Sequence, residues 1–175
     1  MIYSFDGRVR YSEIGENGLL TLPGILNYFQ DCSTFQSEEV GLGLKVLKEW
    51  KRFWVLSAWQ VIVERYPALG EQIRTSTWAY GFRGFMGFRN FTMDTADGER
   101  LAYANTFWTY INRENGVPVR LTERDMEGYG LEEKLDAMVR HELYVKYKTA
   151  PTEEEREQAR LEYLDRRGVP KSFRW

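Results

Sequence analysis

The residues of this sequence that could do chemistry on a carbonyl substrate lie at helical spacing in one segment. Asn27, Asp31 and Thr34 stand at i, i+4 and i+7, so on an α-helix their side chains share one face. A carboxylate beside a carboxamide can position water or attack a carbonyl carbon, as hydrolysis of a thioester requires. We therefore take these three residues as catalytic candidates. The alternative is that the stripe is only the exposed or subunit-facing side of the helix.

Three other reactive side chains are weaker candidates. Cys32, the only cysteine, falls between the apolar Phe29 and Phe35, which predicts a buried and unreactive thiol. His141, the only histidine, falls in a predicted C-terminal helix, where a surface position is expected unless the tail folds back or reaches across a dimer. Glu16 stands in a Gly-Glu-Asn-Gly turn and is expected to be solvated.

Composition narrows the class of protein. The chain has 175 residues, of which 43% are hydrophobic and 15% aromatic, as in a folded domain. Its net charge of -2 provides no excess of positive charge for binding nucleic acid. A lone cysteine excludes an intrachain disulfide and cysteine-cluster metal sites, and it favours a reducing cytoplasm. No metal, cofactor or membrane span is expected, because the sequence has no phosphate-loop or zinc spacing and no apolar run of membrane length.

The catalytic candidates fall in a segment with the pattern of a buried helix. Thr21 suits an N-cap, Pro23 suits a first turn and Gly41 suits a C-terminal stop, so we predict a helix over residues 22–40. Apolar residues cover most of the circumference of this helix, which predicts that protein surrounds it on most sides. They are Ile25, Leu26, Tyr28, Phe29, Cys32 and Phe35.

Strand-like segments stand on both sides of this helix. One precedes it, over residues 2–14, and four rich in β-branched and aromatic residues follow at 53–66, 71–80, 88–95 and 101–112. We predict an α+β hotdog fold, in which a curved antiparallel sheet of about five or six strands wraps around one long central helix. This arrangement would bury the helix nearly all round.

The C-terminal part of the sequence has a helical pattern, unlike the strand-like segments before it. Residues 121–147 and 152–167 are predicted to be helices, the second with acidic residues in its first turn. We therefore divide the chain into a hotdog domain, residues 1–120, and a helical C-terminal extension, residues 121–175. The extension is expected to be a lid, an arm or an interface.

The segment GFRGFMGFR, residues 81–89, joins two of the predicted strands. Its three glycines permit the bend and positive φ angles of a hairpin or a bulge, with the phenylalanines returning to the core. A second interpretation is that the glycines let a ligand approach the backbone while Arg83 and Arg89 meet an anion. Lys45, Lys48 and Arg52 recur at i, i+3 and i+7 and are a similar candidate cluster for a phosphate or an acidic partner, or else a solvated helix face.

Four motifs occur in the same order as in a known family. They are Arg10–Gly15 (RYSEIG), the region of Tyr28, Val63–Pro67 (VERYP) with Gly70, and the Trp108-x-x-x-Asn112 spacing. Over roughly residues 3–130 the sequence resembles the N-terminal hotdog half of acyl-acyl carrier protein thioesterases of plants and bacteria. The resemblance implies a hotdog fold and a hydrolase that releases a fatty acid from an acyl thioester.

One family feature is missing from the sequence. Members usually carry a second hotdog half with a catalytic motif of the type Asp-x-Asn-x-His-x-Asn-Asn, and no such motif occurs here. The chain is then either a hydrolase that acts as an assembly of hotdog units, or a non-catalytic acyl-thioester-binding or scaffolding module. The implied partners are acyl carrier protein or an acyl-CoA thioester, and a second copy in a homodimer or higher oligomer.

The resemblance also assigns candidates for substrate binding. Apolar walls suit an acyl chain, and cations suit the phosphate of a pantetheine arm or an acidic carrier. The candidates are Tyr28, Trp54, Trp59, Trp78, Arg83 and Arg89.

Overall fold

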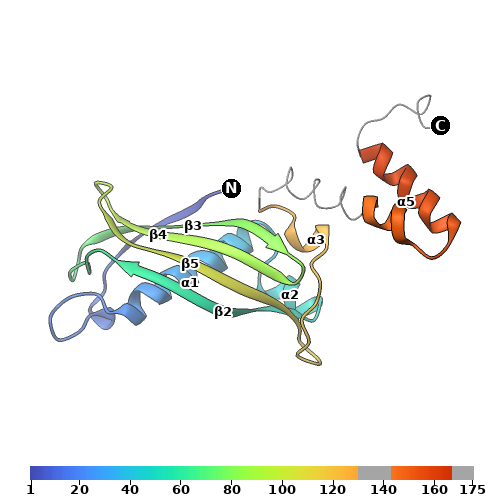
Figure 1. Cartoon of the computed structure of the whole chain (residues 1–175). Coiled ribbons are helices and arrows are strands. Elements are labelled where there is room, and N and C mark those ends of the chain that lie inside the picture. The colour runs from blue at the N-terminus through green and yellow to red at the C-terminus, as the bar shows by residue number, and fades with distance from the viewer. Residues whose placement is uncertain (130–142, 167–175) are drawn as a thin grey trace. The chain divides into compact units, whose positions relative to one another are not determined.

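The structure is a computed structural model that describes residues 1–129 and 143–166 (Figure 1). The chain divides into two compact units, Met1–Gly130 and Leu131–Trp175. The first unit contains one antiparallel sheet and the long helix α1, Leu22–Glu39. Our division at residue 120 stays a prediction. No helix in the described residues is long and apolar enough to cross a membrane.

Five strands in the order β1-β3-β4-β5-β2 form the sheet. Every neighbouring pair is antiparallel, and the registers are irregular at three places, between Leu56 and Ala58 of β2, after Ala79 of β3, and after Met93 of β4. Such bulges bend a sheet, so it can curve around a helix. The strands are β1 Tyr3–Arg8, β2 Arg52–Val63, β3 Gln72–Arg83, β4 Met86–Thr95 and β5 Arg100–Asn112.

Helix α1 begins as its sequence predicts, and its side against the sheet is buried. The hydroxyl of Thr21 accepts a hydrogen bond from the backbone N–H of Gly24, at 3.1 Å, and caps the first turn. Ile25 and Phe29 are fully buried, and Phe29 stacks on Phe91 of β4 with ring centroids 5.1 Å apart. The hotdog prediction is confirmed: an antiparallel sheet packs on one long central helix.

One side of α1 is less covered than expected. Phe35 is 45% exposed, although its ring meets Phe5 of β1 edge to face at 5.6 Å. The sheet contacts this helix on one side, so residues on the opposite side keep contact with solvent in the single chain. The expectation of burial at Phe35 is therefore wrong.

The first strand is shorter than the predicted 2–14. It ends at Arg8, and Tyr11–Glu13 form a 3-10 turn, η1, whose Tyr11 is 82% exposed. The cause is local, because the carboxylate of Glu13 turns back to accept a hydrogen bond from the backbone N–H of Arg10 at 2.9 Å. A short-range bond of this kind competes with strand pairing.

The basic segment after α1 folds as a second, short helix. This helix, α2, spans Leu44–Glu49 and contacts both α1 and β2. Arg52 lies on β2 rather than on α2, so it does not share a helix face with Lys45 and Lys48. The predicted cluster of three cations on one face is therefore wrong.

The predicted helix over 121–147 is wrong at its start. Only Glu123–Met126 is helical there, as α3, and the chain then turns at Gly128, which has a φ of +83°. A left-handed residue ends a helix because it cannot continue the right-handed backbone. In the second unit, residues 143–149 are helical and α5 spans Glu153–Arg166; residues 130–142 and 167–175 lie outside the described part.

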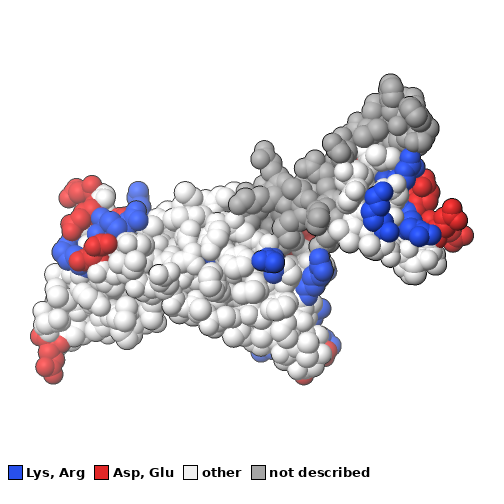
Figure 2. Space-filling model, in the orientation of Figure 1, with Lys and Arg blue, Asp and Glu red and all other residues white. Residues whose placement is uncertain are grey.

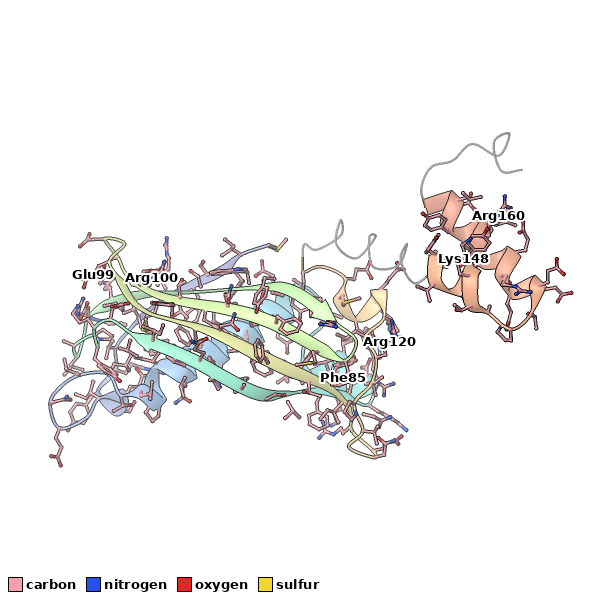
Figure 3. The ribbon with its side chains drawn as sticks, in the orientation of Figure 1. Phe85, Glu99, Arg100, Arg120, Lys148 and Arg160 are labelled. Carbon is pink, nitrogen blue, oxygen red and sulfur yellow. The ribbon has the colours of Figure 1, made fainter. Side chains whose placement is uncertain are left out.

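Charged side chains of the first unit gather at the two ends of its sheet. In the face shown in Figure 2, the middle of the sheet carries almost no charge, and lysine and arginine side chains gather at one end. Figure 3 marks that end by Phe85 and Arg120, and the opposite end by Glu99 and Arg100. The end marked by Phe85 is formed by the β3–β4 hairpin, where the backbone N–H of Leu121 donates to the carbonyl of Gly84 at 2.8 Å.

Candidate functional site

A cavity of ≈ 170 Å³ opens at the hairpin end of the first unit, between α1, α2 and the sheet. Most of its walls are apolar or aromatic, as acyl and other apolar ligands require. The remaining lining is hydroxyl, amide or guanidinium; no Asp, Glu or His of the described residues lines it. The apolar lining comprises Leu42, Leu44, Leu47, Phe53, Trp54, Ala79, Phe82, Gly87, Phe88, Trp108 and Tyr129.

The aromatic wall of the cavity is built around Trp54. Its indole packs on Tyr110 with ring centroids 4.7 Å apart and on Phe82 at 6.1 Å. The phenol of Tyr110 donates a 2.7 Å hydrogen bond to the carboxylate of Asp125, which fixes it beneath the indole. The wall is therefore held by packing and by a buried hydrogen bond, not by the strand alone.

The polar wall of the cavity is one face of α1. Ser33 and Thr34 donate to the carbonyl of Gln30, at 2.8 and 3.0 Å, and Ser37 donates to the carbonyl of Ser33 at 2.9 Å. Each hydroxyl is thus engaged by the helix backbone one turn earlier. The phenol of Tyr129 lies 3.0 Å from the hydroxyl of Ser37, and no Asp, Glu or His of the described residues lines the cavity. This wall therefore provides shape and polarity rather than an activated nucleophile.

Arg89 of β4 lies at the buried end of the cavity. It is 7% exposed, whereas Leu44, on the lining from α2, is 67% exposed. One guanidinium nitrogen, Nη1, donates to the side-chain carbonyl of Gln36 and, at 3.0 Å, to the hydroxyl of Thr77. Both acceptors are neutral. Burial lowers the pKa of Arg89. The ordinary pKa of arginine is so high, however, that the group stays a cation at neutral pH.

The three predicted catalytic residues are not brought together at the cavity. Thr34 lines it, but Asn27 and Asp31 are exposed on α1 outside the lining. No hydrogen bond in the described structure joins Asn27 to Asp31. Within one copy of the chain, the predicted stripe is therefore mainly a solvent-facing surface. A catalytic role for it stays a proposal.

Two of the six predicted substrate-binding residues, Trp54 and Arg89, line the cavity. Arg83 is exposed at the end of β3, and Trp78 alternates with the buried Thr77 and Ala79, so it points to the other face of the sheet. Trp78 and Arg83 are absent from the lining. Arg89 is buried, so it cannot meet an acidic carrier at the surface.

Tyr28 and Trp59 have structural contacts instead. The Tyr28 hydroxyl donates to the carboxylate of Glu13 at 2.8 Å and lies 3.0 Å from the carbonyl of Arg8, and burial and this carboxylate raise the pKa of Tyr28 to about 12. Trp59 is partly buried and packs on the core residues Phe29 and Phe91. Neither residue lines the cavity.

The remaining reactive side chains do not contribute to the cavity. Cys32 is fully buried against β3, where its thiol lies 3.5 Å from the carbonyl of Thr75, and burial raises the pKa of the thiol to about 12. Glu16 is exposed in its turn. His141 lies outside the described residues. No group of three metal-ligating side chains occurs in the part of the chain that the structure describes.

Several lining residues were missed by sequence reasoning. Gln30, Ser33 and Ser37 continue the polar stripe of α1 at i, i+3 and i+7, so a signal for them was present. Periodicity shows that a stripe exists, but not which half of it faces a cavity. Arg113 and Tyr129 come from loops after the last strand, and no periodic pattern marks them.

Residues 2–129 match the family described as Acyl-ACP thioesterase N-terminal domain. A palmitoyl-acyl carrier protein thioesterase from the chloroplast of Gossypium hirsutum is 26% identical over 121 residues, which cover 65% of this chain and 29% of that protein. The chain thus spans less than a third of the length of this curated relative.

Solved structures of thioesterases also match this chain. An acyl-ACP thioesterase from Bacteroides thetaiotaomicron is 26% identical, with a TM-score of 0.65, covering 69% of this chain and 49% of that one. A probable thioesterase from Bartonella henselae is 19% identical, with a TM-score of 0.65, and the match covers 70% of this chain and 100% of that one. The same fold thus makes up the whole of that solved chain. This chain belongs to the acyl-ACP thioesterase family through its N-terminal domain.

Proposed function

We propose that the chain takes part in hydrolysis of an acyl thioester, and that its cavity binds the acyl group. The observation that carries this proposal is the largely apolar cavity between α1, α2 and the sheet of a domain from this family. Burying acyl carbons there contributes about 0.8 kcal/mol for each CH₂ group removed from water. Binding energy from the acyl group can position the thioester for attack at the cavity mouth.

The catalytic group is proposed to come from an assembly of hotdog units. The described lining of one copy holds no Asp, Glu or His, and so offers no carboxylate or imidazole as a general base. The exposed side of α1 offers Asn27 and Asp31, with Thr34 at the cavity edge. We propose that a homodimer or higher oligomer brings this stripe to a thioester held by a neighbouring unit.

The thioester carrier is proposed to be acyl carrier protein or CoA. Arg52 and Arg113 line the cavity, Arg83 is exposed nearby, and lysine and arginine side chains gather at this end of the sheet (Figure 2). Cations there suit a pantetheine phosphate or an acidic carrier surface. We also retain fatty acid metabolism in a reducing cytoplasm as the predicted setting, the latter from the lone cysteine.

A second function is favoured by the same lining. A cavity whose described lining has no carboxylate or imidazole can bind an acyl thioester without cleaving it, which would make the chain a binding or scaffolding module. Release of free thiol from acyl carrier protein and CoA thioesters of several chain lengths tests the two functions. Turnover by the purified chain supports the hydrolase; binding without turnover supports the module; neither binding nor turnover rules out both.

A further inference from the structure

The geometry points to a subsite for an anionic oxygen group at the buried end of the cavity, formed by Arg89. We propose that the acyl ligand carries a carboxylate at the end farthest from its thioester. This inference rests on the proposed acyl-binding function and deepens it, because it names the chemical class of the acyl group. A plain hydrocarbon end would leave the cation without a counter-charge from residues 1–129 and 143–166.

The buried cation is the first observation that supports this subsite. The guanidinium of Arg89 is 7% exposed and lines the cavity. A guanidinium has five N–H donors. Nη1 provides the bonds to Gln36 and Thr77, and the phenol of Tyr129 is a further neutral partner, so donors remain for a ligand. No Asp or Glu among residues 1–129 and 143–166 forms an ion pair with it. Burying a charge with only neutral partners is costly, so a ligand anion would stabilise the site.

The surroundings of Arg89 hold the guanidinium in place. Gln36 is itself 1% exposed, and its amide nitrogen lies 3.3 Å from the carbonyl of Met1. The backbone carbonyl of Arg89 accepts a 2.9 Å hydrogen bond from Thr106. The ring of Tyr129 lies 5.6 Å from the guanidinium carbon, within the range of a cation–π contact. A cation fixed in this way loses little freedom when it binds an anion.

The cavity volume limits the size of the acyl group that fits inside it. At ≈ 170 Å³ it is close to an engineered apolar cavity of roughly 150 Å³ that holds one benzene molecule. A segment of about six carbon atoms therefore fits in the cavity, whose lining includes Arg89. The favoured ligand is a short acyl thioester with a terminal carboxylate.

Binding of unreactive CoA thioethers tests the subsite without turnover. The probes are S-hexyl-CoA and its counterpart with a terminal carboxylate on a chain of the same carbon count, measured by titration calorimetry with the whole chain. Because the CoA part is common, the ratio of their dissociation constants reports only the far end of the acyl group. We expect the carboxylate probe to bind at least about tenfold more tightly, since a charge-assisted hydrogen bond is among the strongest available.

Variants assign the preference to Arg89. In Arg89→Met, which keeps length and removes charge, the preference should disappear, whereas Arg89→Lys should keep part of it. The matched control is Arg74→Met on β3, an exposed arginine outside the cavity, and it should leave the ratio unchanged. If Arg89→Met does not fold, the test uses the ratio of the two dissociation constants in the unaltered chain and in Arg89→Lys. A ratio that falls in Arg89→Lys then assigns the preference to Arg89.

The outcomes separate this inference from the proposed function. Equal binding of the two probes, or tighter binding of S-hexyl-CoA, overturns the subsite and leaves acyl binding intact. A preference that persists in Arg89→Met also overturns it. Failure of both probes to bind overturns acyl binding itself, and the subsite with it. Free hexanoate is the last probe: if it binds as tightly as the carboxylate thioether, the subsite holds a free carboxylic acid rather than a thioester.

Discussion

Gly87 lies directly against the indole of Trp54. A Cβ atom placed on Gly87 would come within 3.0 Å of Cζ3 of that indole and 3.2 Å of the ring of Phe82. The glycine therefore lets β4 approach the aromatic wall of the cavity at a distance that no side chain allows. In GFRGFMGFR, the third glycine is needed for this close approach, whereas Gly84, with a φ of +63°, makes the turn.

Replacing Gly87 should test this contact. We expect Gly87→Ala to lower the free energy of unfolding by about 1 kcal/mol, because the added methyl displaces the indole of Trp54. Affinity for acyl thioester analogues should fall as well, since the displaced ring narrows the cavity. Chemical denaturation and calorimetric titration measure the two effects.

Gly81→Ala is the matched control for this variant. A Cβ atom at Gly81 meets its nearest neighbour, the ring of Phe88, at 3.8 Å, an ordinary contact. It should change both quantities less than Gly87→Ala. Equal losses in the two variants would show that the strand, rather than the indole contact, is sensitive.

The pair formed by Glu13 and Tyr28 should make stability depend on pH in the acid range. Burial opposes ionisation of Glu13, but hydrogen bonds from Arg10 and Tyr28 outweigh it, so the folded pKa of Glu13 lies below its ordinary value of 4.5. A lowered folded pKa stabilises the fold above the unfolded pKa, and this stabilisation is lost as the pH falls through the folded pKa. Unfolding curves from pH 6 downwards should therefore lose stability below about 4.5.

Variants of this pair separate its contributions. Tyr28→Phe should lower the free energy of unfolding by about 1–2 kcal/mol at neutral pH, because the carboxylate of Glu13 and the carbonyl of Arg8 lose a donor. Glu13→Gln should flatten the acid dependence. An unchanged acid slope in Glu13→Gln would assign the dependence to other carboxylates, such as Asp6, whose pKa is lowered by Arg74.

Cys32 should be inert in the folded chain. Its thiol is fully buried with a pKa near 12, so at pH 8 almost no thiolate is present and reagents cannot reach it. Labelling by a disulfide reagent should be slow in buffer and fast in denaturant. Fast labelling of the folded chain would show that α1 opens away from β3.

Asp31 is the sharpest test of the proposed catalytic stripe. Its side chain is exposed, so Asp31→Ala should leave the melting temperature nearly unchanged. If the stripe acts across an assembly, thiol release should fall by about 10²-fold or more, with dissociation constants for unreactive analogues unchanged. Asp97→Ala, in the exposed β4–β5 turn, is the control. Full activity of Asp31→Ala would remove this residue from the catalytic proposal.

The fold could be predicted from the sequence because the patterns that indicate its helix and strands are local and periodic. The cap at Thr21 and the apolar pattern of α1 predict one long helix, and the β-branched runs predict the strands around it. The strand ending at Arg8 and the short α3 were missed, because single hydrogen bonds and a left-handed glycine end them. Such features depend on individual atoms rather than on a repeating pattern.

The sequence by itself determined the hotdog fold, the family of the domain, and the presence of one polar stripe and several arginines. Only the tertiary structure decided which of these residues meet. Sheet curvature and the packing of α2 leave Ser33 and Ser37 facing a cavity and Asp31 facing solvent, although all three lie on one helix. The same packing buries Arg89 and exposes Arg83, six residues apart in one hairpin. Burial depends on neighbours distant in sequence, and no local pattern encodes those neighbours.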